Sequence, residues 1–337
     1  MATARTAQAA MQGQARQQAS PVPIIFDSDM DGDCDDVAAL ALLHVLADRG
    51  EAEILATVTS SRSVFSPQCM SAINTYYGRG DLPVGVPKEA IARPSKYAQA
   101  VARLPHAVRS VQEAQDAVQV YRRALEAAKD GTVVIATVGF HTNLAAILRE
   151  PWGPELVRRK VRLWACMGGN FIGKPARDDL ALGNVNFQKD AAAAYFAIRN
   201  WPTRIVFVGR EVASVPSGVK IGARFAQLDA GHPLRIAYEA YFGGVCRDRH
   251  IADPATVLFA VRGQADLWDM ESDGYMDLQE DLTFQWRYDE SRNQSYLLKK
   301  FDAQGVPNDK QVERVVEQLV MTPPRAGSQV GPLSPGE

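Results

Sequence analysis

Six aspartates occupy the ten-residue segment DSDMDGDCDD, residues 27–36. The apolar run PVPIIF precedes this segment, and the Ala- and Leu-rich stretch VAALALL follows it. Carboxylates packed this densely repel one another unless a cation lies among them. The loop is therefore the first candidate for chemistry, and a hard divalent cation is the ligand that its oxygen atoms would suit.

Two other kinds of aspartate loop are compatible with part of this pattern. An EF-hand calcium loop needs a bidentate Glu at its last position, where this sequence has Ala38, and it needs a helix where PVPIIF reads as a buried strand. A phosphatase nucleophile of the haloacid-dehalogenase type needs Thr or Val at the position of Asp31. A third kind, a metal site at a strand end of an α/β enzyme, fits both flanks. The alternative without chemistry is an acidic turn that caps a helix beginning near Val37.

The rest of the chain alternates short apolar runs with longer helical stretches. The expected strands are PIIFD, EILATVTS, TVVIATVG, VRLWACMGG and RIVFVG, and the expected helices between them include DDVAALALLHVLADRG, PQCMSAINTYYGRG, TNLAAILRE and KDAAAAYFAIRNWP. This alternation predicts an α/β fold with an open, mostly parallel sheet, helices on both faces and a Rossmann-like core. Ligands of such sheets bind at the carboxyl ends of the strands. The aspartate loop and the segments TSS, VGFHTN and MGGN all follow expected strands.

Composition limits the classes of protein that remain. The chain has 337 residues, 46% of them hydrophobic and 23% charged, which is ordinary for a globular protein. A formal net charge of -2 provides no electrostatic basis for binding nucleic acid or an anionic membrane. The four cysteines lack zinc-site spacing and are expected to be free thiols. We therefore expect a small-molecule partner, with no nucleic acid and no membrane.

The two ends of the chain differ from its middle. Residues 1–20 are rich in Ala and Gln without the apolar core of a secretory signal, and residues 322–337 are rich in Pro, Gly and Ser. We expect a disordered leader and a disordered tail around a single α/β domain at residues 21–321. The expected location is the cytoplasm, and export stays open if the native N-terminus is missing.

Five segments together resemble the inosine-uridine-preferring nucleoside hydrolase family. DSDMDGDCDDVAALALL is similar to its N-terminal aspartate motif, although two residues longer, and VGFHTNLA is similar to its G-P-L-T-N-[IL]-A segment. MGGN, NVNFQKDAAAA and DPATVLFAVRG resemble three further motifs, in the family's order. The resemblance implies hydrolysis of the N-glycosidic bond of a ribonucleoside or related ribosyl compound, which releases free base and ribose.

The resemblance also implies a calcium ion, Ca²⁺, as cofactor. By position, its ligands would be the side chains of Asp29, Asp36 and Asp253 and the backbone carbonyl of Val138. Asp29 would additionally act as the general base toward a bound water. The inner Asp27 would support the loop.

Substrate contacts follow from the same comparison. Asp35 would accept a hydrogen bond from a ribose hydroxyl, and Asn186 matches a ribose-binding asparagine of the family. Asn184 stands where many members have a Glu for the 5′-hydroxyl, and Met167 and Asn170 belong to the MGGN turn. The family further implies a homodimer or homotetramer.

Departures from the family pattern leave other interpretations open. Ala252 stands where several members have a histidine that protonates the leaving base, so a non-catalytic, calcium-stabilised binding protein is the alternative function. Asp253 could instead be a helix N-cap before Pro254, and Asn186 could cap the helix KDAAAAYF. His250 is the nearest histidine that could replace the missing acid.

Overall fold

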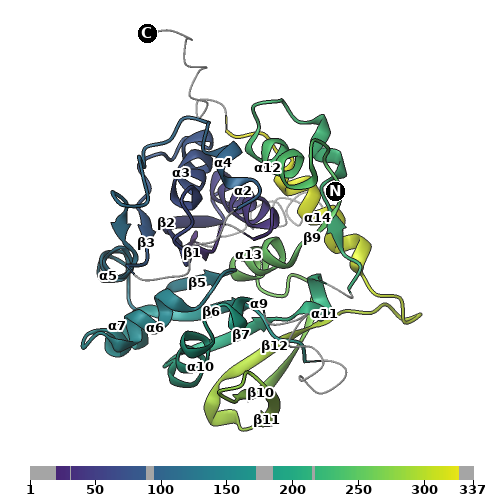
Figure 1. Cartoon of the computed structure of the whole chain (residues 1–337). Helices are drawn as coiled ribbons and strands as arrows, with labels where there is room; N and C mark the ends of the chain where they lie inside the picture. The colour runs from purple at the N-terminus through teal and green to yellow at the C-terminus, as the bar shows by residue number, and fades with distance from the viewer. Residues whose placement is uncertain (1–19, 31, 89–94, 172–184, 215–216, 326–337) are drawn as a thin grey trace, which may run out of the picture.

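The computed structural model describes residues 20–30, 32–88, 95–171, 185–214 and 217–325 (Figure 1). Ten strands form one sheet in the order β11-β10-β12-β7-β6-β5-β1-β2-β3-β4, and β8 and β9 form a separate antiparallel pair. The strands are β1 (Val22–Ser28), β2 (Ala52–Thr59), β3 (Val84–Val86), β4 (Gln115–Asp116), β5 (Val133–Thr137), β6 (Val161–Met167), β7 (Arg204–Val208), β8 (Lys220–Ile221), β9 (Arg249–His250), β10 (Trp268–Leu278), β11 (Phe284–Tyr288) and β12 (Gln294–Lys299).

Helices cover both faces of the sheet because successive strand residues point to opposite sides. In β1, for example, Ile24 and Phe26 join one core and Ile25 joins the other. The first face carries α2 (Asp35–Asp48), α3 (Ser66–Tyr76), α4 (Ala98–Val101), α12 (Pro233–Phe242), α13 (Ala252–Arg262) and α14 (Asp309–Val320). The second carries α5 (Ala117–Ala127), α6 (Thr142–Arg149), α7 (Gly153–Lys160) and α10 (Ala191–Asn200). The short elements are α9 (Val185–Gln188), α11 (Arg210–Ala213) and the 3₁₀ turns η1 (Ala223–Gln227) and η2 (Glu290–Arg292).

The predicted fold class is confirmed. Every pairing from β4 across the sheet to β12 is parallel, and the two pairings of β10, with β12 and with β11, are antiparallel. The chain runs outward from β1 through β2, β3 and β4 and then returns to place β5 on the other side of β1. This reversal opens a crevice at the carboxyl ends of β1 and β5, where ligands of such sheets bind.

The strands β10, β11 and β12 were not expected from the sequence. They extend the sheet beyond β7, and β10 and β11 project as a hairpin at the bottom of Figure 1. β10 carries charged residues along WDMESDGYMDL, and its alternation of buried and exposed residues is regular only in the second half. The apolar pattern that identified the central strands is therefore weak here.

The described helices include none that is long and apolar enough to cross a membrane. The four cysteines are free thiols. Most of the predicted leader and tail lies outside the described residues.

Candidate active site

A pocket of about 300 Å³ opens at the predicted edge of the sheet. Seven predicted site residues line it, and they come from five parts of the chain: Asp29, Asp35, Asp36, Val138, Met167, Asn186 and Asp253. Nine further residues complete the lining described: Gly32, Asp33, Gly168, Val185, Arg210, Ser214, Arg249, His250 and Ala252. The fold thus brings the predicted aspartates of the loop to the distant Asp253.

Close backbone packing fixes the start of the aspartate loop. A Cβ atom on Gly139 would lie 2.2 Å from the Asp29 backbone nitrogen, so only glycine fits after β5. The Ser61 Oγ donates a hydrogen bond to the Asp29 carbonyl at 3.0 Å, and the Ser66 Oγ donates one to the Met30 carbonyl at 3.1 Å. Met30 itself has a φ of 48°, in the left-handed region. The loop is therefore held from β5, from the end of β2 and from α3.

Asp36 lies in the first turn of α2 with both carboxylate oxygens in hydrogen bonds. Its Oδ1 accepts a hydrogen bond from Ser28 Oγ, and its Oδ2 accepts one from Tyr97 Oη at 3.1 Å. Asp36 is 1% exposed. The Met30 backbone nitrogen also donates to Oδ1 at 3.4 Å, and these donors together orient the carboxylate.

Asp27 lies at the end of β1 and is fully buried below the pocket. Its Oδ2 accepts hydrogen bonds from Tyr121 Oη at 2.8 Å and from Asn143 Nδ2 at 3.0 Å. Burial raises the pKa of Asp27 to about 7, and these two hydrogen bonds oppose the rise. The residue ties β1 to α5 and α6 and does not line the pocket.

Asp35 and Asp253 face each other across the junction of α2 and α13. The backbone nitrogen of Asp253 donates a hydrogen bond to Asp35 Oδ2 at 3.4 Å. Burial raises the pKa of each carboxyl group well above its ordinary value, and repulsion from neighbouring aspartates adds to the shift. The interpretation of Asp253 as an N-cap is wrong, because α13 begins at Ala252, two residues before Pro254, and its N-cap position is Ile251.

Asn186 contacts the predicted carbonyl ligand. Its Nδ2 donates to the Val138 carbonyl at 2.9 Å and lies 3.3 Å from the Met167 sulfur. The interpretation of Asn186 as a helix cap is wrong, since Asp190 caps α10 by accepting a hydrogen bond from the Ala193 backbone nitrogen at 3.1 Å. Asn186 instead connects the ends of β5 and β6 at the pocket.

Not all of the residues that sequence reasoning singled out are found in the described lining. Asn170 is described and partly buried, but it lies outside the lining. Asn184 and Asp31 lie outside the described residues. Their predicted or possible roles stay untested.

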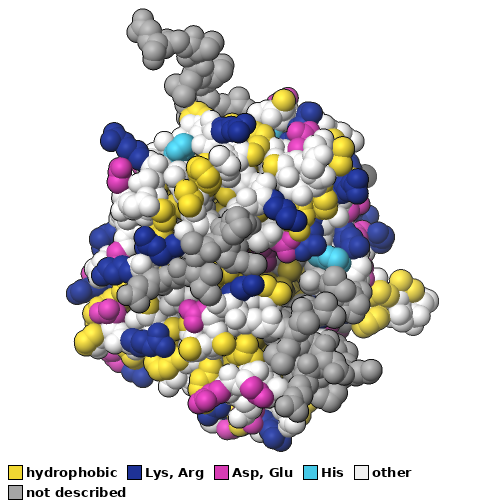
Figure 2. All heavy atoms as spheres, in the orientation of Figure 1, with side chains coloured by type: hydrophobic (Ala, Val, Ile, Leu, Met, Phe, Trp, Pro, Cys, Tyr) yellow, Lys and Arg dark blue, Asp and Glu magenta, His cyan; other side chains and the backbone are white. Residues whose placement is uncertain are grey.

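Sequence reasoning named His250 but missed the two arginines on the same side of the pocket. Arg210 begins α11 immediately after β7, so the strand-end rule could have identified it. Arg249 and His250 form β9, a two-residue strand that no local pattern indicated. Arg249 forms an ion pair with Asp33, whose other oxygen accepts a hydrogen bond from Tyr241 Oη at 2.6 Å. On the face in Figure 2, acidic, basic and histidine side chains meet to the right of centre.

The donor chemistry of the pocket fits calcium. The predicted ligands are all oxygen atoms, which Ca²⁺ prefers, and the buried carboxylates repel one another in a way that a cation would relieve. Nevertheless, no three His, Cys, Asp or Glu side chains of the described part form a group that could hold a metal ion. Calcium binding therefore stays a prediction.

Comparison with known proteins identifies the relatives of this architecture. A solved structure titled as an inosine-uridine preferring nucleoside hydrolase from Bacillus anthracis superposes with a TM-score of 0.64 and 16% identity, covering 89% of this chain and 99% of that one. The effector protein XopQ complexed with adenosine diphosphate ribose gives a TM-score of 0.64 and 16% identity, with 93% and 98% covered. An inosine-guanosine nucleoside hydrolase gives 0.58 and 17%, with 88% and 98% covered. At these identities the likeness shows the fold. The comparison with curated proteins found no match.

The family model described as "Inosine-uridine preferring nucleoside hydrolase" matches residues 24–308. This span includes the aspartate loop, β5 with Val138, and the start of α13 with Asp253. The match covers most of the chain and confirms the resemblance seen in the five sequence motifs. The chain belongs to the inosine-uridine preferring nucleoside hydrolase family.

Proposed function

We propose that this protein hydrolyses the N-glycosidic bond of a ribosyl compound and uses calcium to do so. The observation that supports this most is the gathering of Asp29, Asp35, Asp36 and Asp253 around one pocket at the switch point of the sheet. Family membership supports the same reaction class.

Asp29, Asp36, Asp253 and the Val138 carbonyl would hold the ion. Bound calcium would supply a site for water, lower the pKa of that water and contact the sugar hydroxyls. The Val138 carbonyl already accepts a hydrogen bond from Asn186, and its second lone pair is available to a cation.

The chain's own residues then have distinct tasks in hydrolysis. The water oxygen forms a bond to C1′ while the C1′–N bond breaks, and the bond's electron pair goes to the base nitrogen. One water proton passes to the carboxylate of Asp29, which later releases it to solvent, and the departing base takes up one proton from solvent. Asp35 accepts a hydrogen bond from a ribose hydroxyl, which holds the sugar during the displacement.

A second candidate function, binding without turnover, is favoured by Ala252. This residue lines the pocket and offers only a methyl group where several family members have a leaving-group acid. Proton transfer from a positioned acid contributes typically about 10²–10⁴-fold to a rate. A protein that lacked any substitute for this acid would still bind a ribosyl ligand.

The two functions are separated by incubating the full chain with inosine, uridine, adenosine and p-nitrophenyl riboside in calcium-containing buffer. Free base and reducing sugar are measured over time. Hydrolysis is expected for at least one substrate, and Asp29→Asn should abolish it while preserving the fold, because the amide keeps the volume but cannot act as a base.

Asp35→Ala provides the contrast, since it should raise KM more than it lowers kcat. Binding of these compounds without release of base would favour the binding protein. If Asp29→Asn turned over substrate at the wild-type rate, the assignment of the base would be wrong. Light scattering would test the homodimer or homotetramer that the family implies.

A further inference from the structure

The pocket differs from an ordinary binding site for a neutral base. None of the residues that line its described part is Phe, Tyr or Trp. Small-molecule pockets are usually lined by apolar and aromatic side chains with few polar groups. Here the apolar lining is limited to Val138, Met167, Val185 and Ala252, with two glycines. Charged side chains therefore make up an unusually large share of the surface that a substrate would meet.

The acidic and basic residues of the pocket come from different segments of the chain, and the ion pair between Arg249 and Asp33 joins the two groups. The carboxylates come from the loop after β1, from α2 and from the first turn of α13. The basic groups come from α11 and from the β8–β9 pair, where Lys220 lies opposite His250 in the register. The pKa of His250 falls to about 4 because of burial and because Lys220, Arg249 and Arg210 are close to it. Arg210 and Arg249 line the pocket together with His250, and we name these three residues the basic wall.

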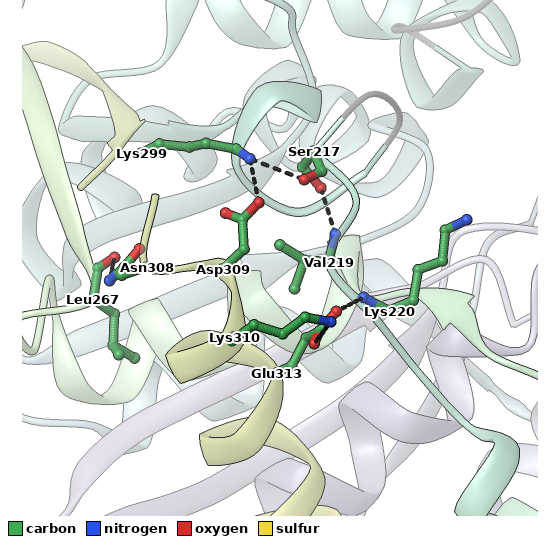
Figure 3. A network of polar contacts seen from close by, with 9 residues as sticks. All are labelled: Ser217, Val219, Lys220, Leu267, Lys299, Asn308, Asp309, Lys310 and Glu313. Carbon is green, nitrogen blue, oxygen red and sulfur yellow. Dashed lines mark hydrogen bonds and ion pairs between the residues drawn. The ribbon is translucent and has the colours of Figure 1, made fainter. Parts of the chain in front are cut away.

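Arg210 of the basic wall is buried, Arg249 and His250 are half-buried, and β9 is paired with β8. Arg210 is 5% exposed, and the Nε–H group of Arg249 is buried without a hydrogen-bond acceptor. Figure 3 shows the contacts that hold β8, the partner strand of β9, and the residues just before it. Lys299 Nζ donates to the Ser217 carbonyl at 2.9 Å, and the Lys220 backbone nitrogen donates to Glu313 Oε1 at 3.0 Å. A buried arginine donor without an acceptor is costly, and an incoming oxygen atom would satisfy it.

We propose that the substrate of this pocket is an anionic ribosyl compound whose phosphate or carboxylate oxygens bind Arg210 and Arg249. The inference rests on the proposed function for the identity of the sugar. A ribosyl compound with an anionic group has hydroxyls for the carboxylate side and oxygens for the basic wall. The planar guanidinium fork matches phosphate and carboxylate geometry, so arginine suits either group.

The test measures binding by calorimetry to the full chain in calcium-containing buffer at fixed ionic strength. Ribose 5-phosphate is compared with ribose, and orotidine, which carries a carboxylate on its base, is compared with uridine. At least one anionic member should bind about tenfold or more tightly than its neutral partner, and the preference should weaken as salt is raised. Ribose 5-phosphate showing the preference would identify a sugar phosphate, and orotidine showing it would identify a charged base. Equal affinities in both pairs would overturn the proposal.

Variants then assign the preference to named residues. Arg210→Met and Arg249→Met should each reduce the preference for the anionic compound by about tenfold, with little change in the affinity for the neutral one. Arg162→Met is the matched control, because this exposed arginine lies at the opposite edge of the sheet, near the start of β6, and should not change the preference. A preference that persists in both pocket variants would refute the assignment to these arginines.

The comparison of wild-type affinities needs no variant, so a misfolded variant cannot hide the answer. The test is also separate from the proposed reaction. Absence of hydrolysis with an intact charge preference would refute the hydrolase assignment alone. Hydrolysis of neutral nucleosides without any charge preference would refute only the anionic substrate.

Discussion

Gly139→Ala should damage both stability and activity, although it adds a single methyl group. The added Cβ would lie 2.2 Å from the backbone nitrogen of Asp29 and 2.4 Å from Ser60 Oγ, where ordinary contacts begin at 3.4 Å. Relief of the backbone clash requires a displacement of about 1.2 Å, the difference between 3.4 and 2.2 Å. The atom in the way belongs to the backbone of the loop and cannot rotate aside.

Overpacking of this kind costs typically about 1–3 kcal/mol. For a chain of this size, 1 kcal/mol lowers the melting temperature by roughly 1.5 °C, so a fall of about 2–5 °C is expected. A catalytic group misplaced by about 1 Å can lose on the order of 100-fold in rate, and Asp29 is the group displaced. Activity should therefore fall much more than stability.

Thermal unfolding followed by circular dichroism and release of base from the best nucleoside would measure the two effects. Gly231→Ala is the matched control, since nothing lies within 4 Å of its added Cβ and its φ is not in the left-handed region. The control should match the wild type to within about 0.5 kcal/mol. A Gly139→Ala variant as stable and as active as the control would refute the account of how the loop is held.

Three further predictions concern the metal, a buried acid and the leaving group. The purified protein should hold about one calcium ion per chain. Chelation should lower its melting temperature, because an ion bound only by the folded state stabilises that state. Elemental analysis showing zinc, iron or no metal would contradict this. Burial raises the pKa of Glu211 to about 7. The raised pKa of Glu211 therefore adds to the free energy of unfolding fully below pH 4.5, and this added free energy is lost as the pH rises from 4.5 through 7. Glu211→Gln should flatten the dependence of the unfolding free energy on pH in that window. Because Ala252 provides no acid and His250, with a pKa of about 4, is mostly neutral at pH 7, p-nitrophenyl riboside should be cleaved about 100-fold or more faster than inosine. Equal rates on both substrates, unaffected by His250→Ala, would place the acid elsewhere.

Much of the fold and half of the pocket could be predicted because they depend on local sequence. Apolar runs such as PIIFD and TVVIATVG became β1 and β5, and the aspartates followed β1 directly. Residues at the ends of central parallel strands meet at one edge, which predicted that the aspartate loop and the segment VGFHTN lie close together, and the family resemblance then singled out Asp29 and Val138 within them. Those strands could be recognised in the sequence because strands buried on both faces form nearly continuous apolar runs.

Only the tertiary structure decided what surrounds the aspartates. Arg249 reaches Asp33 across 216 residues of chain, through a two-residue strand that has no periodicity to read. The cap of α10 is Asp190 rather than Asn186, and α13 begins at Ala252 rather than after Asp253, because packing sets helix starts to within a few residues and those few residues decide whether a side chain caps a helix or lines the pocket. Sequence patterns determine elements through period and propensity, which act over a few residues. The sign of the charge across a pocket depends on contacts between distant segments, and these exist only once the chain has packed.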